Sequence, residues 1–253
     1  MALPQNNTLV KKYLKDIKSA DTWSVFKIIS DFVKGFDELS DLGPSVTVFG
    51  SARFDENNKY YQQARELASI LAHQGFSIVT GGGPGIMEAA NRGAFEAGGV
   101  ESIGLNIDLP HEQLPNPYAT KTLEFEYFFS RKVMLVKYSM AYVIFPGGFG
   151  TLDELFESLT LVQTKKVTGV KIFLVGKEFF EPLIEFLEKS LLAHGTISKE
   201  DLELFEVCDD LYEIAQKIHT SLLDQLHSIK ELGLANTAYY KSLEKLKERI
   251  EHE

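Results

Sequence analysis

Cysteine is nearly absent from this chain of 253 residues, which holds only Cys208. A single cysteine excludes a disulfide within the chain and any metal site built from several cysteines, and it fits a reducing compartment. Long apolar runs are also missing, because no stretch approaches the roughly 20 residues that a membrane-spanning helix needs. The opening residues, MALPQNNTLV, lack the apolar core of a signal peptide. We therefore expect a soluble cytoplasmic protein.

Positive charge is in short supply. The chain has 26 Lys and Arg residues against 36 Asp and Glu residues, which gives a formal net charge of −10. No cluster of basic residues appears, and this argues against binding to nucleic acids or to anionic membranes. An anionic small molecule would have to be held by a local device.

The sequence does contain a regular alternation of short apolar runs and amphipathic segments. Seven strands are predicted from β-branched or aromatic runs, at residues 46–49, 76–80, 102–107, 123–125, 141–145, 170–175 and 204–207. Helices are predicted between them, the main ones at residues 59–75, 128–139, 151–165, 179–193 and 211–223 and one that ends near 97. This pattern is typical of an α/β fold, a Rossmann-like doubly wound parallel sheet with helices on both faces. Ligands of such sheets bind beyond the carboxyl ends of the strands, where the strand order reverses.

Helical segments are expected at both ends of the chain. Residues 1–43 read as an N-terminal extension of two short helices, the second capped by Asp21. Residues 44–225 form the predicted Rossmann-like domain. Residues 226–253 form a C-terminal extension, in which Leu243, Leu246 and Ile250 make a thin apolar stripe in a charged helix.

Two glycine loops stand out, GGGPG at residues 81–85 and PGGFGT at residues 146–151. Each lies between the end of a predicted strand and the start of a helix. Free N–H groups and the positive end of the helix dipole favour an anion there, and glycine lets the backbone approach it closely. Two such loops at neighbouring strand ends predict a phosphate-binding site.

The loops do not fit the standard glycine motifs. A dinucleotide fingerprint needs a glycine where this chain has Ile86 or Asp153, and neither loop ends in the Gly-Lys of a nucleoside triphosphate loop. The sequence also contains no H-E-x-x-H, no G-x-S-x-G and no EF-hand loop. We therefore expect no metal and no cofactor.

Charged residues lie beside both loops. Glu154 follows the second loop, in what reads as the first helical turn, where an acid ordinarily compensates the helix dipole. Arg131 lies at the start of the helix that leads into the fifth strand, where a surface cation is the ordinary interpretation. The residues alone indicate a phosphate-binding α/β protein with an acid and a base nearby, and they name no reaction.

Three motifs together resemble the Lonely guy (LOG) family. They are GGGPGIM at residues 81–87, SRKVMLV at 130–136 and PGGFGTLDE at 146–154, and the resemblance extends from about Val46 to Val175. Members of this family are phosphoribohydrolases that release the free base from cytokinin riboside 5′-monophosphates. The longer chain resembles the larger bacterial subgroup. Some relatives carry the label lysine decarboxylase, but nothing in this sequence suggests a pyridoxal phosphate site.

The resemblance implies a role for particular residues. Arg131 and Glu154 would be the catalytic pair. The residues that would hold the phosphate and ribose of the substrate are Gly82, Gly83, Gly85, Gly147, Gly148, Gly150 and Thr151. Further candidates for contact with the substrate are Ser51, Met87, Glu88 and Lys132. Because Glu88 stands where plant-like members usually have a glycine, a preference for an N6-prenylated base or for plain AMP stays open.

The segment after the third strand, residues 107–120, reads either as a lid over the base or as a plain connection. His111 within it is the one histidine expected near the site, and solvated loop histidine is its ordinary interpretation. Phe128, Phe129, Met134 and Tyr138 are expected in the core rather than against a base.

Three functions compete at this point. The first is a hydrolase that cleaves the N-glycosidic bond of purine nucleoside 5′-monophosphates, such as AMP, to free base and ribose 5-phosphate. The second is a non-catalytic carrier or sensor of a nucleotide-like ligand, because molybdenum cofactor carriers resemble this family and also have glycine loops. The third is a scaffold, which leaves the paired loops unexplained. The resemblance also implies a homodimer or a larger homo-oligomer.

Overall fold

The structure, a computed structural model, describes residues 22–108 and 114–252. All seven predicted strands are present, as β1 (Ser45–Phe49), β2 (Ser77–Thr80), β3 (Ser102–Ile107), β4 (Lys121–Phe125), β5 (Ser139–Ile144), β6 (Lys171–Leu174) and β7 (Glu206–Val207). The α-helices are α2 (Thr22–Glu38), α3 (Lys59–His73), α4 (Ile86–Ala97), α5 (Phe128–Lys137), α6 (Phe149–Gln163), α7 (Lys177–Phe186), α8 (Leu211–Glu231) and α9 (Ala238–His252). Within these ranges no helix is both long and apolar enough to cross a membrane. The predicted α/β fold class is confirmed.

The strands form one parallel sheet in the order β4-β3-β2-β1-β5-β6-β7. The chain first builds the sheet outward from β1 to β4 and then returns to add β5 on the other side of β1. The strand order therefore reverses between β1 and β5. The carboxyl ends of these two strands lie level, because Phe49 pairs with Ile144. A ligand site is expected beyond these ends.

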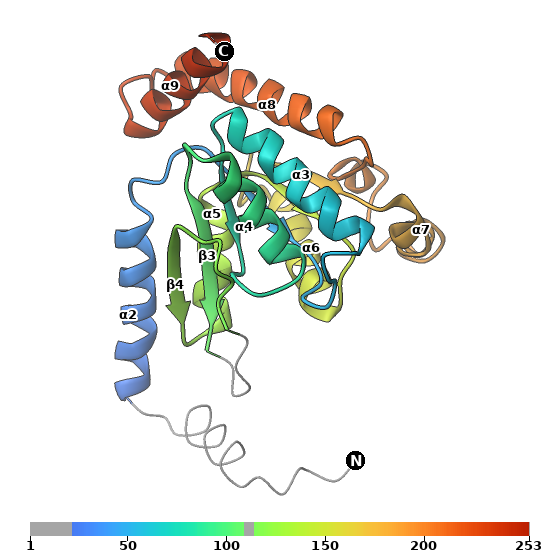
Figure 1. The fold of residues 1–253 in the computed structure, drawn as a ribbon. Coiled ribbons are helices and arrows are strands. Elements are labelled where there is room, and N and C mark those ends of the chain that lie inside the picture. Colours follow the sequence, from blue (N-terminus) through green and yellow to red (C-terminus); the bar gives the residue numbers. More distant parts are fainter. Residues whose placement is uncertain (1–21, 109–113, 253) are drawn as a thin grey trace, which may run out of the picture.

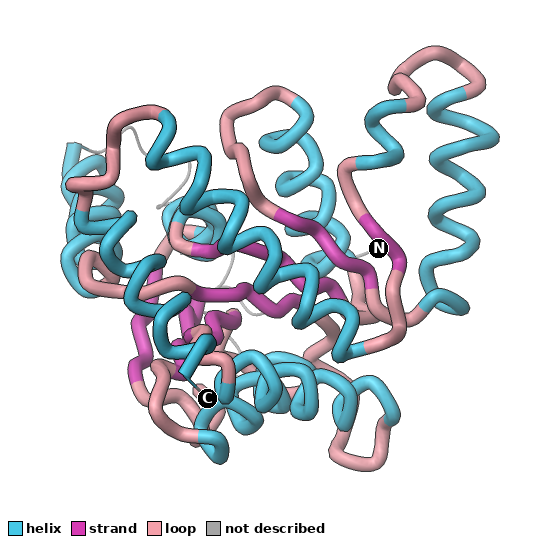
Figure 2. The backbone as a smooth tube through the Cα atoms, turned by 90° about the horizontal axis from the view of Figure 1, so that it is seen from above, coloured by secondary structure: helices cyan, strands magenta, loops and turns pink. Residues whose placement is uncertain are grey.

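Helices cover both faces of the sheet (Figures 1 and 2). Helices α3, α4, α8 and α9 pack on one face, where the core includes Val46, Val48 and Val143. Helices α5, α6 and α7 pack on the other face, where the core includes Phe49 and Tyr142. Neighbouring strand residues thus point to opposite faces, and both faces are apolar, as a parallel sheet buried on both sides requires.

The first described helix, α2, packs against α5 on the second face (Figure 1). Its residue Gly35 makes the close approach possible, because an added Cβ would lie 2.8 Å from the sulfur of Met134. The predicted cap Asp21 and the first of the two predicted N-terminal helices lie outside the described residues.

The C-terminal helices join the main core rather than forming a separate layer. Leu243 and Leu246 of α9 are buried in the same cluster as the strands, and Ile250 packs against it, so the predicted stripe is an inward face. Helix α8 runs on to Glu231, well beyond the predicted end at residue 223, and crosses the boundary expected at 225. The division into a domain and two extensions stays a prediction.

One helix departs from the sequence prediction. The segment predicted as a helix over 179–193 begins at Lys177 and changes at Leu187 into a π-helix that ends at Leu192. The prediction is right about its helical character and wrong about its regularity.

Candidate active site

A cavity of about 790 Å³ opens beyond the carboxyl ends of β1, β2 and β5. Its walls come from the loops that follow these strands and from α5 and α6. The loop after β1 lies directly against the loop after β5, because the N–H of Ser51 donates a hydrogen bond of 3.0 Å to the carbonyl of Pro146. The cavity therefore lies at the point where the strand order reverses, as expected for this fold.

The loop after β5 presents the open end of α6 to this cavity. Gly147, Gly148, Gly150 and Thr151, the candidates from this loop, all line it. The first intrahelical bond of α6 runs from the N–H of Leu152 to the carbonyl of Gly148, so the three N–H groups before Leu152 have no partner inside the helix. The capping residue of α6 is Gly148, which has no side chain to accept hydrogen bonds from these N–H groups. This end can accept an anion.

The loop after β2 forms the opposite wall. Gly83 lines the cavity, whereas Gly82 and Gly85 lie behind its surface and shape the loop. Both adopt positive φ values, +70° and +71°. A side chain on Gly85 would overlap the carbonyl oxygen of Ser51, so glycine at this position lets the loops after β1 and β2 touch.

Arg131 and Glu154 meet inside the cavity wall, Arg131 from α5 and Glu154 from α6. Arg131 Nη2 lies 3.8 Å from Glu154 Oε1, and their side chains are only 13% and 8% exposed. Arg131 Nε and Glu154 Oε2 have no hydrogen-bond partner among the described residues. Unpartnered buried polar atoms are rare in folded proteins and call for an explanation, such as a catalytic role.

Burial shifts the pKa of both groups in the direction that favours their neutral forms. It raises the pKa of Glu154 to about 7, against the opposing attraction of Arg131 and Lys132. Burial also lowers the pKa of Arg131, against the attraction of Glu154 and Asp153. A carboxyl group with a pKa near neutrality can both take up and release a proton at physiological pH.

The place of Glu154 in its helix corrects the sequence interpretation. Helix α6 begins at Phe149, two residues before the predicted start, so Glu154 is its sixth residue and lies beyond the first turn. Compensation of the helix dipole falls off within the first turn and does not account for a buried acid at this position.

Two of the remaining candidates point elsewhere. Lys132 Nζ lies 2.7 Å from Asp153 and 2.8 Å from Glu157, and thus ties α5 to α6 outside the lining of the cavity. Glu88 accepts a hydrogen bond of 2.9 Å from the hydroxyl of Tyr61 on α3. Ser51 and Met87, by contrast, line the cavity.

The cavity also contains residues that the sequence did not single out. Arg53 and Asn106 line it, the first from the loop after β1 and the second from β3. Phe128 lines it too, and the Arg131 guanidinium lies 5.3 Å from its ring centre. The expectation that Phe128 and Phe129 belong to the core is wrong, since both are about half exposed, whereas Met134 is buried as expected. His111 lies outside the described residues.

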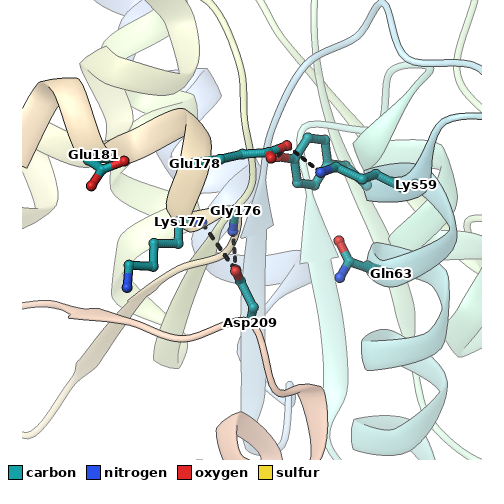
Figure 3. Close-up of a pocket in the computed structure, with 8 residues that line it drawn as sticks. Lys59, Gln63, Gly176, Lys177, Glu178, Glu181 and Asp209 are labelled. Atoms are coloured by element: carbon teal, nitrogen blue, oxygen red, sulfur yellow. Dashed lines mark hydrogen bonds and ion pairs between the residues drawn. The ribbon is translucent and has the colours of Figure 1, made fainter.

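A second, smaller pocket of about 290 Å³ lies beside the ends of β6 and β7. Figure 3 shows that Asp209 reaches the start of α7, where its Oδ1 accepts hydrogen bonds from the N–H groups of Gly176 (2.6 Å) and Lys177 (3.2 Å). Lys59 and Glu178 pair with each other across this pocket. The helix end here is already filled by a carboxylate of the chain itself.

Comparison with known proteins gives the family. A family model described as possible lysine decarboxylase matches residues 87–218, more than half of the chain. The chain belongs to this family, the LOG family. A cytokinin riboside 5′-monophosphate phosphoribohydrolase of Rhodococcoides fascians is 26% identical over 174 residues, which cover 66% of this chain and 85% of that protein. An Arabidopsis thaliana protein of the same name is 26% identical over 187 residues, covering 72% and 85%.

Solved structures of the same fold include a molybdenum cofactor carrier protein of Chlamydomonas reinhardtii. It is 23% identical in sequence, and the TM-score is 0.51. The superposed region covers 72% of this chain and 99% of the carrier protein. At this identity the likeness shows the Rossmann-like fold alone. The relatives in sequence and the neighbours in fold thus differ in what their names say they do.

Proposed function

We propose that this LOG-family chain is a hydrolase that cleaves the N-glycosidic bond of purine nucleoside 5′-monophosphates to free base and ribose 5-phosphate. The observation that carries the proposal is the buried Arg131–Glu154 pair, which lies in the same cavity as the open end of α6. A carrier needs the anion-binding loops but no acid with a pKa near 7 beside them. The pair is the addition that chemistry would require.

The open end of α6 would hold the 5′-phosphate through main-chain N–H groups. Anchoring the phosphate fixes the sugar, so that binding energy from a group that does not react orients the reacting carbon. Gly148 and Gly150 have open space where a side chain would otherwise stand, which leaves room for phosphate oxygens.

Glu154 would act at the anomeric carbon. Breaking the bond between C1′ and the base nitrogen passes through a sugar with oxocarbenium character, which a nearby carboxylate stabilises. The carboxylate takes a proton from the attacking water as the C1′–O bond forms. Its pKa of about 7 allows that proton to leave again, and the departing base takes one up.

Arg131 would position rather than transfer protons, because a guanidinium stays charged under ordinary conditions. Its charge favours the ionised form of Glu154, and its planar fork can bind phosphate or base. The description of the family as possible lysine decarboxylase finds no support in this cavity. No lysine lines it among the described residues, whereas a pyridoxal phosphate enzyme needs one for its Schiff base.

The test is release of free base from AMP and from isopentenyladenosine monophosphate. Chromatography measures the free base, and a separate assay measures ribose 5-phosphate. We expect release from at least one of them and a loss of about 100-fold or more in Arg131→Ala. Arg131→Lys keeps the positive charge but lacks the planar guanidinium. It therefore separates the effect of the charge on Glu154 from binding of the phosphate or base by the guanidinium. Binding without release would make the chain a carrier, and release that Arg131→Ala leaves unchanged would refute the pair.

We also propose that the chain forms at least a homodimer, as the family resemblance implies. Large apolar side chains remain exposed on α2, α5 and α6, including Phe149, which is 94% exposed. Contiguous exposed apolar surface commonly marks a protein interface. Light scattering during gel filtration should give at least twice the chain mass of 28.4 kDa; the chain mass itself would contradict the proposal.

A further inference from the structure

A buried carboxylate on the N-terminal helix holds the start of the helix that carries Arg131. Asp31 of α2 is only 6% exposed. Its Oδ2 accepts hydrogen bonds from the N–H of Glu126 (2.9 Å), the N–H of Tyr127 (3.1 Å) and the hydroxyl of Ser130 (2.8 Å). One oxygen atom from a distant segment thus satisfies three donors at one helix start.

Two of these donors, the N–H groups of Glu126 and Tyr127, lie just before α5, and the third, Ser130, lies in its first turn. Tyr127 is the capping residue of α5, and its own side chain makes no capping bond. The carbonyl of Tyr127 accepts the N–H of Arg131 at 3.2 Å. The same peptide region is therefore held by Asp31 on one side and bonded to Arg131 on the other. Ser130, the chain neighbour of Arg131, is fully buried.

Two further contacts fix α2 along α5. The rings of Phe32 and Phe129 lie 6.3 Å apart. One turn further along α2, Gly35 lies so close to Met134 that an added Cβ would meet its side chain at 2.8 Å. Asp31, Phe32 and Gly35 thus contact successive parts of α5, which leaves little freedom for this helix to shift.

We propose that Asp31 is a positioning residue that places Arg131 beside Glu154, and that α2 is in this way part of the catalytic apparatus. The proposal rests on the function proposed above for Arg131 and Glu154. It gives the N-terminal helix a role that the matched family region, residues 87–218, does not contain.

A merely structural role and a positioning role predict different pH profiles. The charged groups around Glu154 are Arg131 and Lys132 on α5 and Asp153 and Glu157 on α6. If α5 shifts, Arg131 moves away from Glu154 and its carboxylate loses a favourable neighbour, so the pKa of Glu154 rises. Simple loss of folded protein lowers the rate at every pH and leaves the midpoint of the profile in place.

The experiment compares base release by the full chain and by Asp31→Ala and Asp31→Asn between pH 5 and 9. For Asp31→Ala, which removes all three hydrogen bonds, we expect kcat/KM to fall by about tenfold, because part of the lost free energy appears as misplacement of Arg131. We expect the midpoint of its pH profile to rise by about one unit. Asp31→Asn keeps a carbonyl oxygen for the three donors. It should restore most of the lost kcat/KM and bring the midpoint of the pH profile most of the way back.

Lys27→Ala is the matched control, because it removes an exposed ion pair between α2 and the same segment, from Lys27 Nζ to Glu126 Oε1 at 2.9 Å. Exposed pairs contribute little, so activity and midpoint should stay within about twofold and a few tenths of a unit. If Asp31→Ala fails to fold by circular dichroism, Gly35→Ala is the second variant: its added Cβ would meet the side chain of Met134 on α5 at 2.8 Å, and we expect a smaller shift in the same upward direction.

An active full chain whose midpoint moves neither in Asp31→Ala nor in Gly35→Ala would overturn this inference and leave the proposed function intact. A full chain that binds nucleotide but releases no base would overturn both.

Discussion

Two helix ends at neighbouring strand ends of this molecule differ in what fills them. Strands β5 and β6 pair in parallel, and each leads into a helix whose capping residue is a glycine, Gly148 for α6 and Gly176 for α7. At α7 the carboxylate of Asp209 accepts the first N–H groups. At α6 the capping glycine offers no side chain to accept the first N–H groups. A cavity of about 790 Å³ lies over this helix end.

The comparison shows that a helix end is a ligand site only when the chain leaves it free. Both ends carry the partial positive charge of a helix start, and both have a glycine as the capping residue. One is a closed structural joint, and the other is the anion site of the proposed enzyme. The neighbouring acid differs as well, since Glu178 at α7 is exposed and paired with Lys59, whereas Glu154 at α6 is buried beside Arg131.

The largest effect is expected from removing the acid that only the α6 end holds. Glu154→Gln keeps the shape of the side chain but cannot carry charge or accept a proton from water. We expect base release from AMP to fall by about 100-fold or more, as for other charge-stabilising groups. The matched control is Glu178→Gln at α7, which should change release by no more than about twofold. Equal losses in both variants would mean that the two ends do not differ in function.

The second way to sharpen the comparison is to fill α6 as α7 is filled. Gly148→Asp is sterically allowed, because Gly148 has an extended backbone (φ −90°, ψ −156°) and open space at its Cβ. The new carboxylate should cap α6 and stabilise the fold by a few tenths of a kcal/mol relative to glycine, and by about 0.5–2 kcal/mol relative to alanine at the same position. It should weaken AMP binding by about tenfold or more, since it takes the N–H groups that a charged ligand would use.

Calorimetric titration and urea unfolding measure the two effects. Gly148→Ala is the control for added volume, because it places a Cβ without an acceptor at the helix end, so the further loss of affinity in Gly148→Asp measures the effect of the carboxylate. Greater stability in Gly148→Asp with unchanged affinity would place the phosphate elsewhere.

The pH dependence tests the environment of the acid at α6. Base release should rise with pH through a midpoint near 7, the pKa of Glu154. The sign for stability is opposite. The folded protein binds this proton more tightly than the unfolded chain, whose carboxyl has a pKa of about 4.5, so the free energy of unfolding falls as pH rises from about 4.5 to 7.

Glu154→Gln should remove this fall, so that the variant gains stability over the natural chain between pH 5 and 8. Urea unfolding at these two pH values is the measurement. A constant difference between the two proteins would show that the pKa of Glu154 is not raised.

The smallest effect is expected at the end that is already filled. Asp209→Ala frees the N–H groups of Gly176 and Lys177 and should cost about 0.5–2 kcal/mol of stability. Base release should stay within about twofold, because the α7 end holds no ligand. Asp209→Asn, which keeps an acceptor, should recover part of the stability. A loss of activity as large as that expected for Glu154→Gln would make this second pocket part of the site.

Much of this fold follows from local patterns in the sequence. The seven strands are readable because buried parallel strands are continuous apolar runs. The glycine loops are readable because glycine allows positive φ, as at Gly82 and Gly85, and a close approach of the backbone to a ligand. The π-helical turn after α7 and the full length of α8 were not readable, since both depend on packing against other segments rather than on local preference.

Some residues of the site could be predicted from the sequence, and others could not. The resemblance supplied Arg131 and Glu154, and their distance and burial now support the proposed roles without testing them. Asn106 and Arg53 carry no local signal, because a strand residue and a loop cation enter the cavity only through the order of the strands. Asp31 was equally hidden, since its three donors lie about a hundred residues further along the chain and nothing local marks it as a cap.

The most direct measurement is a crystal structure of Glu154→Gln with AMP bound. The phosphate should lie at the start of α6, with oxygens about 2.7–3.2 Å from the main-chain nitrogens of Gly150 and Thr151, and C1′ should face residue 154. A phosphate bound at Arg53 or at the α7 end, with the α6 N–H groups left to water, would contradict the account.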